Sequence, residues 1–217
     1  MTSERTFKRE LKRLNILKAA RSLFLEKKYN AITMDEIARQ AGITKMTLYN
    51  YFPSKLALYV HVFDEKLQQL HRDLTRCASR ELPIDKLILA FFNTLFTFTK
   101  NNEKFMRLFW TLDSDEFDGV IPEELGQRII IWTKAMFDVV ISVFKKGQQE
   151  GCLTNRDPVL LIHLMSAVNK GIFIHTNKES RFSIAEIDPE DLYNEYVDLI
   201  SAGLFKSPAE NKKGNMP

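Results

Sequence analysis

Residues 44–52, TKMTLYNYF, carry side chains that can hydrogen-bond to base edges and to phosphates. An asparagine can pair with adenine through two hydrogen bonds, a lysine can pair with guanine, and a methionine can touch a thymine methyl group. Tyrosine and threonine hydroxyls commonly contact phosphates. On a helix, Leu48 and Phe52 share one side, so the polar residues occupy the rest of the circumference. This composition is typical of a helix that binds duplex DNA.

A preceding helix must position this stretch. Thr33 and Glu36 have the spacing of a capping box, so a helix is expected to begin at about Thr33. Apolar residues then recur at helical spacing, and Gly42 supplies the backbone freedom that a sharp turn between helices requires. A second helix begins near Thr44. An ordinary helical hairpin with a solvated polar face would show the same pattern.

The three helix starts in this region differ in charge. Asp35 and Glu36 lie in the first turn after Thr33, where the positive end of a helix favours carboxylates. Thr44 and Ser54 are each followed by a lysine and have no carboxylate in the first turn. Backbone phosphates would satisfy the free amides at these two helix ends.

The stretch from Asn15 to Leu58 resembles the N-terminal DNA-binding domain of TetR-family transcriptional regulators. Two positions depart from the family pattern, because Lys28 and Met46 stand where the family often has glycine. The matching positions are Ala19-Ala20, Leu23-Phe24, Tyr29, Thr33, Ile37-Ala38, Ala41-Gly42, Thr44-Lys45, Leu48-Tyr49, Tyr51-Phe52 and Lys55.

The resemblance implies which residues contact DNA. The implied phosphate contacts come from Thr33, Thr44, Thr47, Tyr49, Tyr51 and Lys55. The implied base-edge contacts come from Lys45, Met46 and Asn50. Double-stranded operator DNA is the expected partner.

The charge distribution agrees with a basic head on a separate body. The 217-residue chain has a net charge of +3, but residues 1–55 hold twelve lysines and arginines against five acidic residues. The remainder is net acidic. A local basic footprint of this kind is expected of a DNA-binding domain. A basic segment that only aids solubility is the alternative.

Composition and spacing exclude several other classes. Apolar residues make up 45% of the chain, which is enough for a full core, and the low glycine and proline counts favour helices. Cys77 and Cys152 are isolated and the four histidines show no ligand spacing, so no metal, cofactor or catalytic group is expected. No stretch of about 18 apolar residues and no signal-like start was found, which predicts a cytoplasmic protein that does not bind membranes.

Helical periodicity continues through the rest of the chain, with no strand pattern. We expect an all-α protein with a three-helix helix-turn-helix domain and a larger helical domain for ligand binding and dimerisation. A long helix after Ser54 connects the two, and Asp157-Pro158 and Asp188-Pro189 start the last two helices. The expected parts are a charged arm at 1–9, the DNA-binding domain at 10–54, the helical body at 55–205 and a disordered tail at 206–217.

The body is rich in aromatic residues. Aromatic side chains at helical spacing usually fill a core, but a helix that is apolar on most sides, such as 103–112, can also border a cavity for an apolar ligand. The TetR resemblance implies an effector pocket without assigning its residues. The candidate lining is Phe91, Leu95, Phe109, Trp110, Trp132, Met136, Phe137 and Phe173.

The last two helices have wide apolar faces. A single chain could bury one such face, but the resemblance suggests that both helices meet a second copy in a four-helix interface. The resulting two-fold dimer predicts a pseudo-palindromic operator. The candidate interface residues are Leu161, Leu164, Met165, Val168, Tyr193, Tyr196, Val197, Ile200 and Leu204.

The sequence thus predicts a homodimeric transcriptional regulator, most simply a repressor that a small apolar or amphipathic effector releases from DNA. An activator or constitutive DNA-binding protein without a ligand is the first alternative. A helical enzyme and a protein-interaction module are two others, and the first of these lacks any nucleophile-base pair, metal spacing or phosphate loop in the sequence.

Overall fold

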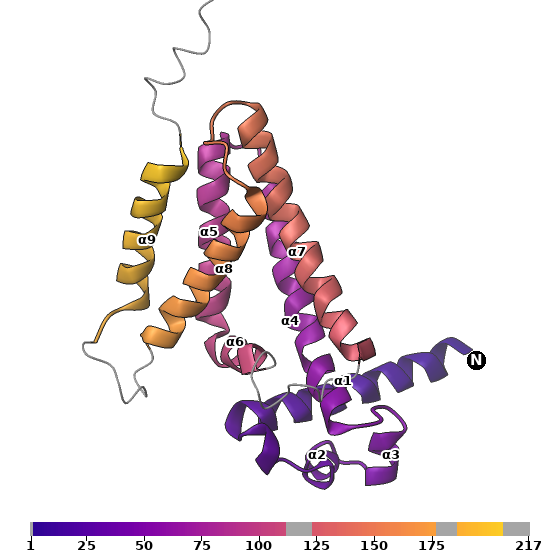
Figure 1. The fold of residues 1–217 in the computed structure, drawn as a ribbon. Helices are drawn as coiled ribbons and strands as arrows, with labels where there is room; N and C mark the ends of the chain where they lie inside the picture. The colour runs from indigo at the N-terminus through magenta and orange to yellow at the C-terminus, as the bar shows by residue number, and fades with distance from the viewer. Residues whose placement is uncertain (1, 112–122, 177–185, 206–217) are drawn as a thin grey trace, which may run out of the picture. The chain divides into compact units, whose positions relative to one another are not determined.

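The computed structural model describes residues 2–111, 123–176 and 186–205 (Figure 1). The fold is all-α, as predicted, and within the described residues the sole β feature is an isolated bridge between Leu153 and Phe205. The expected tail at 206–217 lies outside these residues. The elements are α1 Thr2–Glu26, the 3-10 helix η1 Tyr29–Ala31, α2 Met34–Gln40, α3 Lys45–Tyr49, α4 Lys55–Ala78, α5 Ile84–Asn101, α6 Glu103–Trp110, α7 Glu123–Gln149, α8 Pro158–His175 and α9 Pro189–Leu204.

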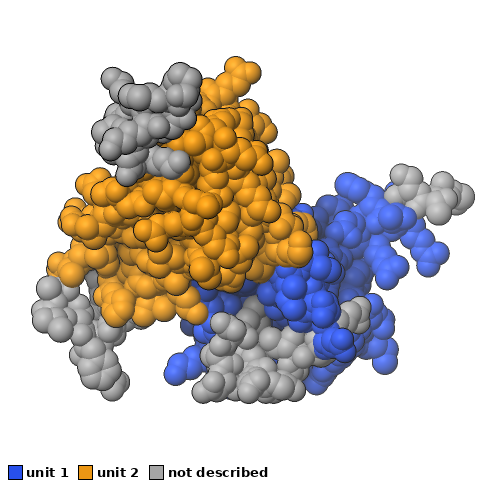
Figure 2. Space-filling view, turned by 45° about the horizontal axis from the view of Figure 1, so that its top comes forward, with its two compact units in different colours: residues 1–69, 104–131 blue, residues 70–103, 132–217 orange. Residues whose placement is uncertain are grey.

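The chain divides into two compact units (Figure 2). Unit 1 contains residues 1–69 and 104–131, and unit 2 contains 70–103 and 132–217. This division differs from the boundary expected at residue 54, because the first part of α4, α6 and the start of α7 group with the N-terminal helices. Both α4 and α7 contribute residues to the two units.

Helix α1 starts earlier than the sequence predicted. Residues 2–9, expected to form a charged arm, continue the helix. Ion pairs between Glu4 and Lys8 and between Glu10 and Arg13 follow the i,i+4 and i,i+3 spacing that supports helices. Leu14 is 49% exposed and lies outside the buried stripe of α1. That stripe comprises Ile16, Leu17, Ala19, Ala20, Leu23 and Phe24.

Aromatic rings explain why unit 1 extends past the predicted boundary. The rings of Tyr59 and Phe63 on α4 lie edge to face, with centroids 5.2 Å apart. Phe63 also contacts Phe105 and Phe109 on α6, at 5.1 and 5.4 Å. Tyr59 further donates its hydroxyl hydrogen to the Leu108 carbonyl, 3.1 Å away. These contacts make one core from α4 and α6, since aromatic pairs of this geometry are favourable beyond their buried area.

Unit 2 is built on contacts among α5, α8 and α9. The predicted starts of α8 and α9 are confirmed, with Asp157 and Asp188 accepting hydrogen bonds from Val159 and Glu190 amides. Inside the unit, Asn169 donates to the Thr99 hydroxyl at 2.9 Å, which satisfies both buried polar side chains.

The aromatic side chains of α9 contribute to the same core. The Tyr193 ring stacks on Phe96 with centroids 4.1 Å apart, and Tyr196 lies edge-on to Phe92. Burial raises the pKa of Tyr193 to about 12, because the phenolate loses hydration there. Burial and the neighbouring Tyr193 also raise the pKa of Tyr196.

Helix α8 is predominantly apolar. Its 18 residues meet the length and hydropathy expected of a membrane span, although the sequence analysis identified no such stretch, and 33% of the helix is buried within the protein. This is weak evidence for a membrane, since the core helices of soluble proteins meet the same criterion. A large exposed apolar surface also suits a protein-protein interface.

Candidate nucleic-acid interface

The helical hairpin forms as the sequence predicts. The Thr33 hydroxyl caps α2 by accepting a hydrogen bond from the Glu36 amide at 3.2 Å. Gly42 has φ +67°, a left-handed conformation that favours glycine. The Thr44 hydroxyl then caps α3 by accepting from the Thr47 amide, also at 3.2 Å. Two caps and one glycine turn therefore fix where α3 begins.

Packing determines which face of α3 is free. Leu48 and Phe52 are 0% and 1% exposed, which confirms that they face inward. Met46 is 78% exposed and Tyr49 is 44% exposed. The other candidates for DNA contact are exposed or half-buried as well, namely Thr33, Thr44, Lys45, Thr47, Asn50, Tyr51 and Lys55.

Lys27 and Glu36 secure the start of α2 electrostatically. The Lys27 ammonium donates to the Glu36 carboxylate at 2.5 Å. This hydrogen bond, followed by the Lys27 charge and a backbone hydrogen bond from Thr33, lowers the pKa of Glu36 against an opposing effect of desolvation. The contribution from Thr33 is the second arm expected of a capping box.

Lys45 has a protein partner in this structure. Its ammonium lies 2.8 Å from Asp35 on α2, and this hydrogen bond raises the lysine pKa. Both side chains are more than half exposed, so the ion pair is weak in water. DNA contact by Lys45 stays a prediction, and it requires the ammonium to exchange a carboxylate for a nucleic-acid acceptor.

Lys55 has a structural role that the sequence did not suggest. Its ammonium donates to the carbonyls of Tyr29 and Ile32, both at 2.8 Å, and lies 4.1 Å from the centre of the Tyr29 ring. Ser54 caps α4 by accepting from the Ala57 amide at 3.0 Å, as the sequence predicts. Lys55 thus holds η1 and the segment before α2 against the start of α4, and its phosphate contact stays a prediction.

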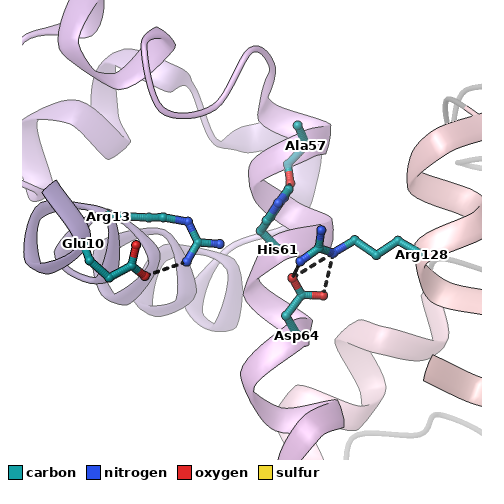
Figure 3. A network of polar contacts seen from close by, with 6 residues as sticks. All are labelled: Glu10, Arg13, Ala57, His61, Asp64 and Arg128. Carbon is teal, nitrogen blue, oxygen red and sulfur yellow. Dashed lines mark hydrogen bonds and ion pairs between the residues drawn. The ribbon is translucent and has the colours of Figure 1, made fainter. Parts of the chain in front are cut away.

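Contacts from α1 also support the hairpin. The Asn15 side-chain amide donates to the carbonyl of Ala41, the C-cap residue of α2, at 2.9 Å. The Arg13 guanidinium binds the Glu10 carboxylate (Figure 3). The same guanidinium lies 5.8 Å from the centre of the Phe52 ring. Sequence spacing cannot reveal the contacts with Ala41 and Phe52, because these partners are far from α1 in the chain.

The candidate effector-pocket residues do not gather in one unit. Phe109 and Trp110 belong to unit 1, whereas Phe91, Leu95, Trp132, Met136, Phe137 and Phe173 belong to unit 2. Phe91, Met136 and Phe173 are buried core residues. Among the described residues, no group of three or more histidine, cysteine or acidic side chains is arranged to hold a metal ion.

The candidate dimer residues divide by burial. Leu161, Met165 and Leu204 are buried within their own chain and cannot offer much surface to a partner. Leu164 is 48% exposed, and Val168, Tyr193, Tyr196, Val197 and Ile200 are half-buried. The sequence analysis missed Leu160 and Leu199, which are 69% and 68% exposed. Leu160 lies at helical spacing to the exposed Leu164 and Ala167, and this spacing was the available signal.

The segment that contains this hairpin matches a known protein family. Residues 16–62 match the family described as bacterial regulatory proteins, tetR family. The transcriptional activator FasR of Mycolicibacterium smegmatis is 28% identical over 138 residues, covering 64% of this chain and 61% of FasR. The match therefore spans less than two thirds of that relative.

Solved structures share the fold. A TetR/AcrR-family transcriptional regulator from Thermobifida fusca superposes with a TM-score of 0.69 at 19% identity, covering 88% of this chain and 97% of that chain. AibR in complex with isovaleryl coenzyme A and operator DNA superposes with a TM-score of 0.67 at 15% identity, covering 87% of this chain and 97% of that one.

Proposed function

Because the chain belongs to the TetR family of bacterial regulatory proteins, we propose that it is a repressor that leaves a pseudo-palindromic operator when a small effector binds. The observation that carries the proposal is the exposed polar face of α3, which lies opposite the buried Leu48 and Phe52. Asn50, Met46 and Lys45 on this face are proposed to read base edges. The threonine and tyrosine hydroxyls beside them are proposed to contact phosphates.

We propose that α8 and α9 form a two-fold dimer interface. Along α8, exposed apolar or small residues lie at 160, 164, 167 and 174, at intervals of four, three and seven residues, which is the heptad spacing of a helix-packing seam. On α9, Leu199 is similarly exposed. A second copy would cover this surface and so accounts for the high hydropathy of α8 without a membrane. A two-fold dimer presents two α3 helices to two half-sites.

The proposed effector is a small apolar or amphipathic molecule that binds the helical body. AibR provides a precedent, since its structure holds both an acyl coenzyme A and operator DNA on this fold. Helix α4 begins at the Ser54 cap and contributes residues to both units, so it is the proposed route of coupling. The effector must then lower the affinity for the operator by the same factor by which the operator lowers the affinity for the effector. The protein would act in the cytoplasm, at the nucleoid.

The similarity to FasR, a transcriptional activator, supports a second function, transcriptional activation. An activator can share the DNA-binding face and the dimer and differ in what effector binding does. In vitro transcription from a promoter that contains the bound site distinguishes the two. A repressor lowers transcript yield when added, whereas an activator raises it.

Fluorescence anisotropy tests the proposed function directly. The purified protein is titrated onto duplexes from the DNA flanking its own reading frame and onto random duplex, and the bound fragment is then titrated with isovaleryl and longer acyl coenzyme A. Specific affinity 10³-fold or more above random is expected, with weaker binding when an effector is present. Specific binding that no acyl coenzyme A changes would argue against this effector class, and equal affinity for both DNAs would contradict sequence reading.

A further inference from the structure

The N-terminal half of α1 forms a basic hollow beside α3. Its volume is about 680 Å³, and Arg5, Thr6, Lys8, Arg9, Lys12 and Tyr51 line it. The four cations recur at i, i+3, i+4 and i+7, so they form one stripe along the helix. The lining contains no carboxylate.

The cations in this hollow are largely available to an external anion. Lys8 pairs with Glu4 at 2.6 Å, but both side chains are more than 70% exposed. Within the described residues, the side chains of Arg5 and Lys12 have no hydrogen bond or ion pair to the protein. The Arg9 guanidinium lies over the Tyr51 ring, with its central carbon 6.0 Å from the ring centre. Exposed unpaired cations on one face indicate a surface for a polyanion.

The hollow is continuous with the proposed DNA-reading face. Tyr51 follows α3 directly and is itself a candidate phosphate ligand, so the same side chain borders both surfaces. Residues 5 and 12 are about 10 Å apart along a helix that rises 1.5 Å per residue. Successive phosphates on one strand of duplex DNA lie about 3.4 Å apart along the axis, so the stripe can follow several of them.

We propose that the basic stripe of α1, formed by Arg5, Lys8, Arg9 and Lys12, binds the DNA backbone outside the bases read by α3. This inference rests on the proposed function and extends it, because it assigns phosphate contacts to the N-terminal half of α1 as well as to α3. Each protomer thereby covers flanking phosphates beyond its half-site. The contacts add affinity and salt dependence without adding sequence preference.

The double variant Arg5→Gln/Lys12→Gln tests this surface. Glutamine removes the charge while keeping good helix propensity. The control Lys18→Gln/Arg80→Gln removes two exposed charges elsewhere, since Lys18 lies on another face of α1 and Arg80 lies in unit 2. Each protein is titrated onto random and specific duplexes across salt concentrations, and phosphate contacts are mapped by ethylation interference.

The slope of log affinity against log salt is expected to fall in magnitude by about 2 per protomer in the test variant. Interference at the outer phosphates should disappear, while the ratio of specific to random affinity stays unchanged. A slope and interference pattern equal to those of the control would overturn the inference while leaving base reading by α3 intact. If the wild-type protein does not distinguish specific from random duplex, the proposed function fails and the inference fails with it.

Discussion

Arg128 on α7 donates hydrogen bonds to both carboxylate oxygens of Asp64 on α4 (Figure 3). Its Nε lies 3.1 Å from Oδ1 and 2.9 Å from Oδ2, and its Nη2 also donates to Oδ2. Asp64 is buried, with 7% of its surface exposed, whereas the Arg128 side chain is 42% exposed. One turn earlier on α4, His61 hydrogen-bonds the Ala57 carbonyl. The ion pair therefore fastens α7 to α4 within unit 1.

Removing the arginine should leave Asp64 buried and unpaired. Arg128→Ala is expected to lower the free energy of unfolding by about 1–3 kcal/mol, because a buried group loses its partner. Urea unfolding followed by circular dichroism measures this change. Replacing both partners, as in Arg128→Met/Asp64→Leu, should recover part of the loss.

The exposed pair between Lys134 and Asp138 on α7 provides the control. Its side chains are 71% and 58% exposed, so Lys134→Ala should change stability by less than about 0.5 kcal/mol. If Arg128→Ala costs no more than this control, the Asp64 pair has no special role in unit 1.

Lys55 is expected to stabilise the DNA-binding domain even without DNA. Lys55→Met removes the donors to the Tyr29 and Ile32 carbonyls and should lower the free energy of unfolding by about 1–2 kcal/mol. Thermal unfolding of the free protein measures this. Lys45→Met, which breaks a weaker exposed ion pair, is the matched control. A Lys55 variant as stable as wild type but impaired on all DNA would show that Lys55 acts on phosphates alone.

The Glu36 carboxylate should make the start of α2 sensitive to acid. Its pKa is lowered in the folded protein, so its stabilising effect is present above the usual value of 4.5 and is lost as pH falls through the lower folded value. In Lys27→Met, the main cause of the shift is gone, and the Glu36 pKa should rise. A carboxyl NMR titration of both proteins measures it, and an unchanged Glu36 pKa would contradict this assignment.

A charge on the exposed stripe of α8 should disrupt the proposed dimer. Leu164→Glu places a carboxylate at a position 48% exposed in one chain, so the folded monomer tolerates it while an apolar interface does not. Sedimentation equilibrium is expected to show a shift from dimer to monomer. Leu14→Glu on α1, at a site 49% exposed, should leave the mass unchanged. If Leu164→Glu and Leu14→Glu both remain dimeric, the dimer interface lies elsewhere than on this face of α8.

Local sequence signals predicted the helix starts well. Thr33, Thr44, Asp157 and Asp188 cap helices where the sequence placed them, because a side-chain cap lies within three residues of the amide it binds. Gly42 likewise takes the left-handed conformation expected at the turn. These features depend on neighbours in the chain, so a single sequence contains them.

Features that depend on distant partners were not predictable in this way. The Lys55 ammonium binds carbonyls 26 and 23 residues away, and Arg128 binds a carboxylate 64 residues away. The unit boundary within α4 follows from ring contacts with Phe105 and Phe109, which periodicity cannot reveal. Leu161 and Met165 were assigned to an interface because an apolar face looks the same whether its own core or a partner covers it.

The most direct test of the central claim is the effect of Asn50→Ala on discrimination between specific and random duplex, measured by anisotropy. Asn50 is exposed at the C-cap of α3, and it is one of the residues proposed to read base edges. Asn50→Ala is expected to lose about 1–3 kcal/mol in binding to the specific duplex, with little change on random DNA. An equal loss on both duplexes would contradict base reading by α3.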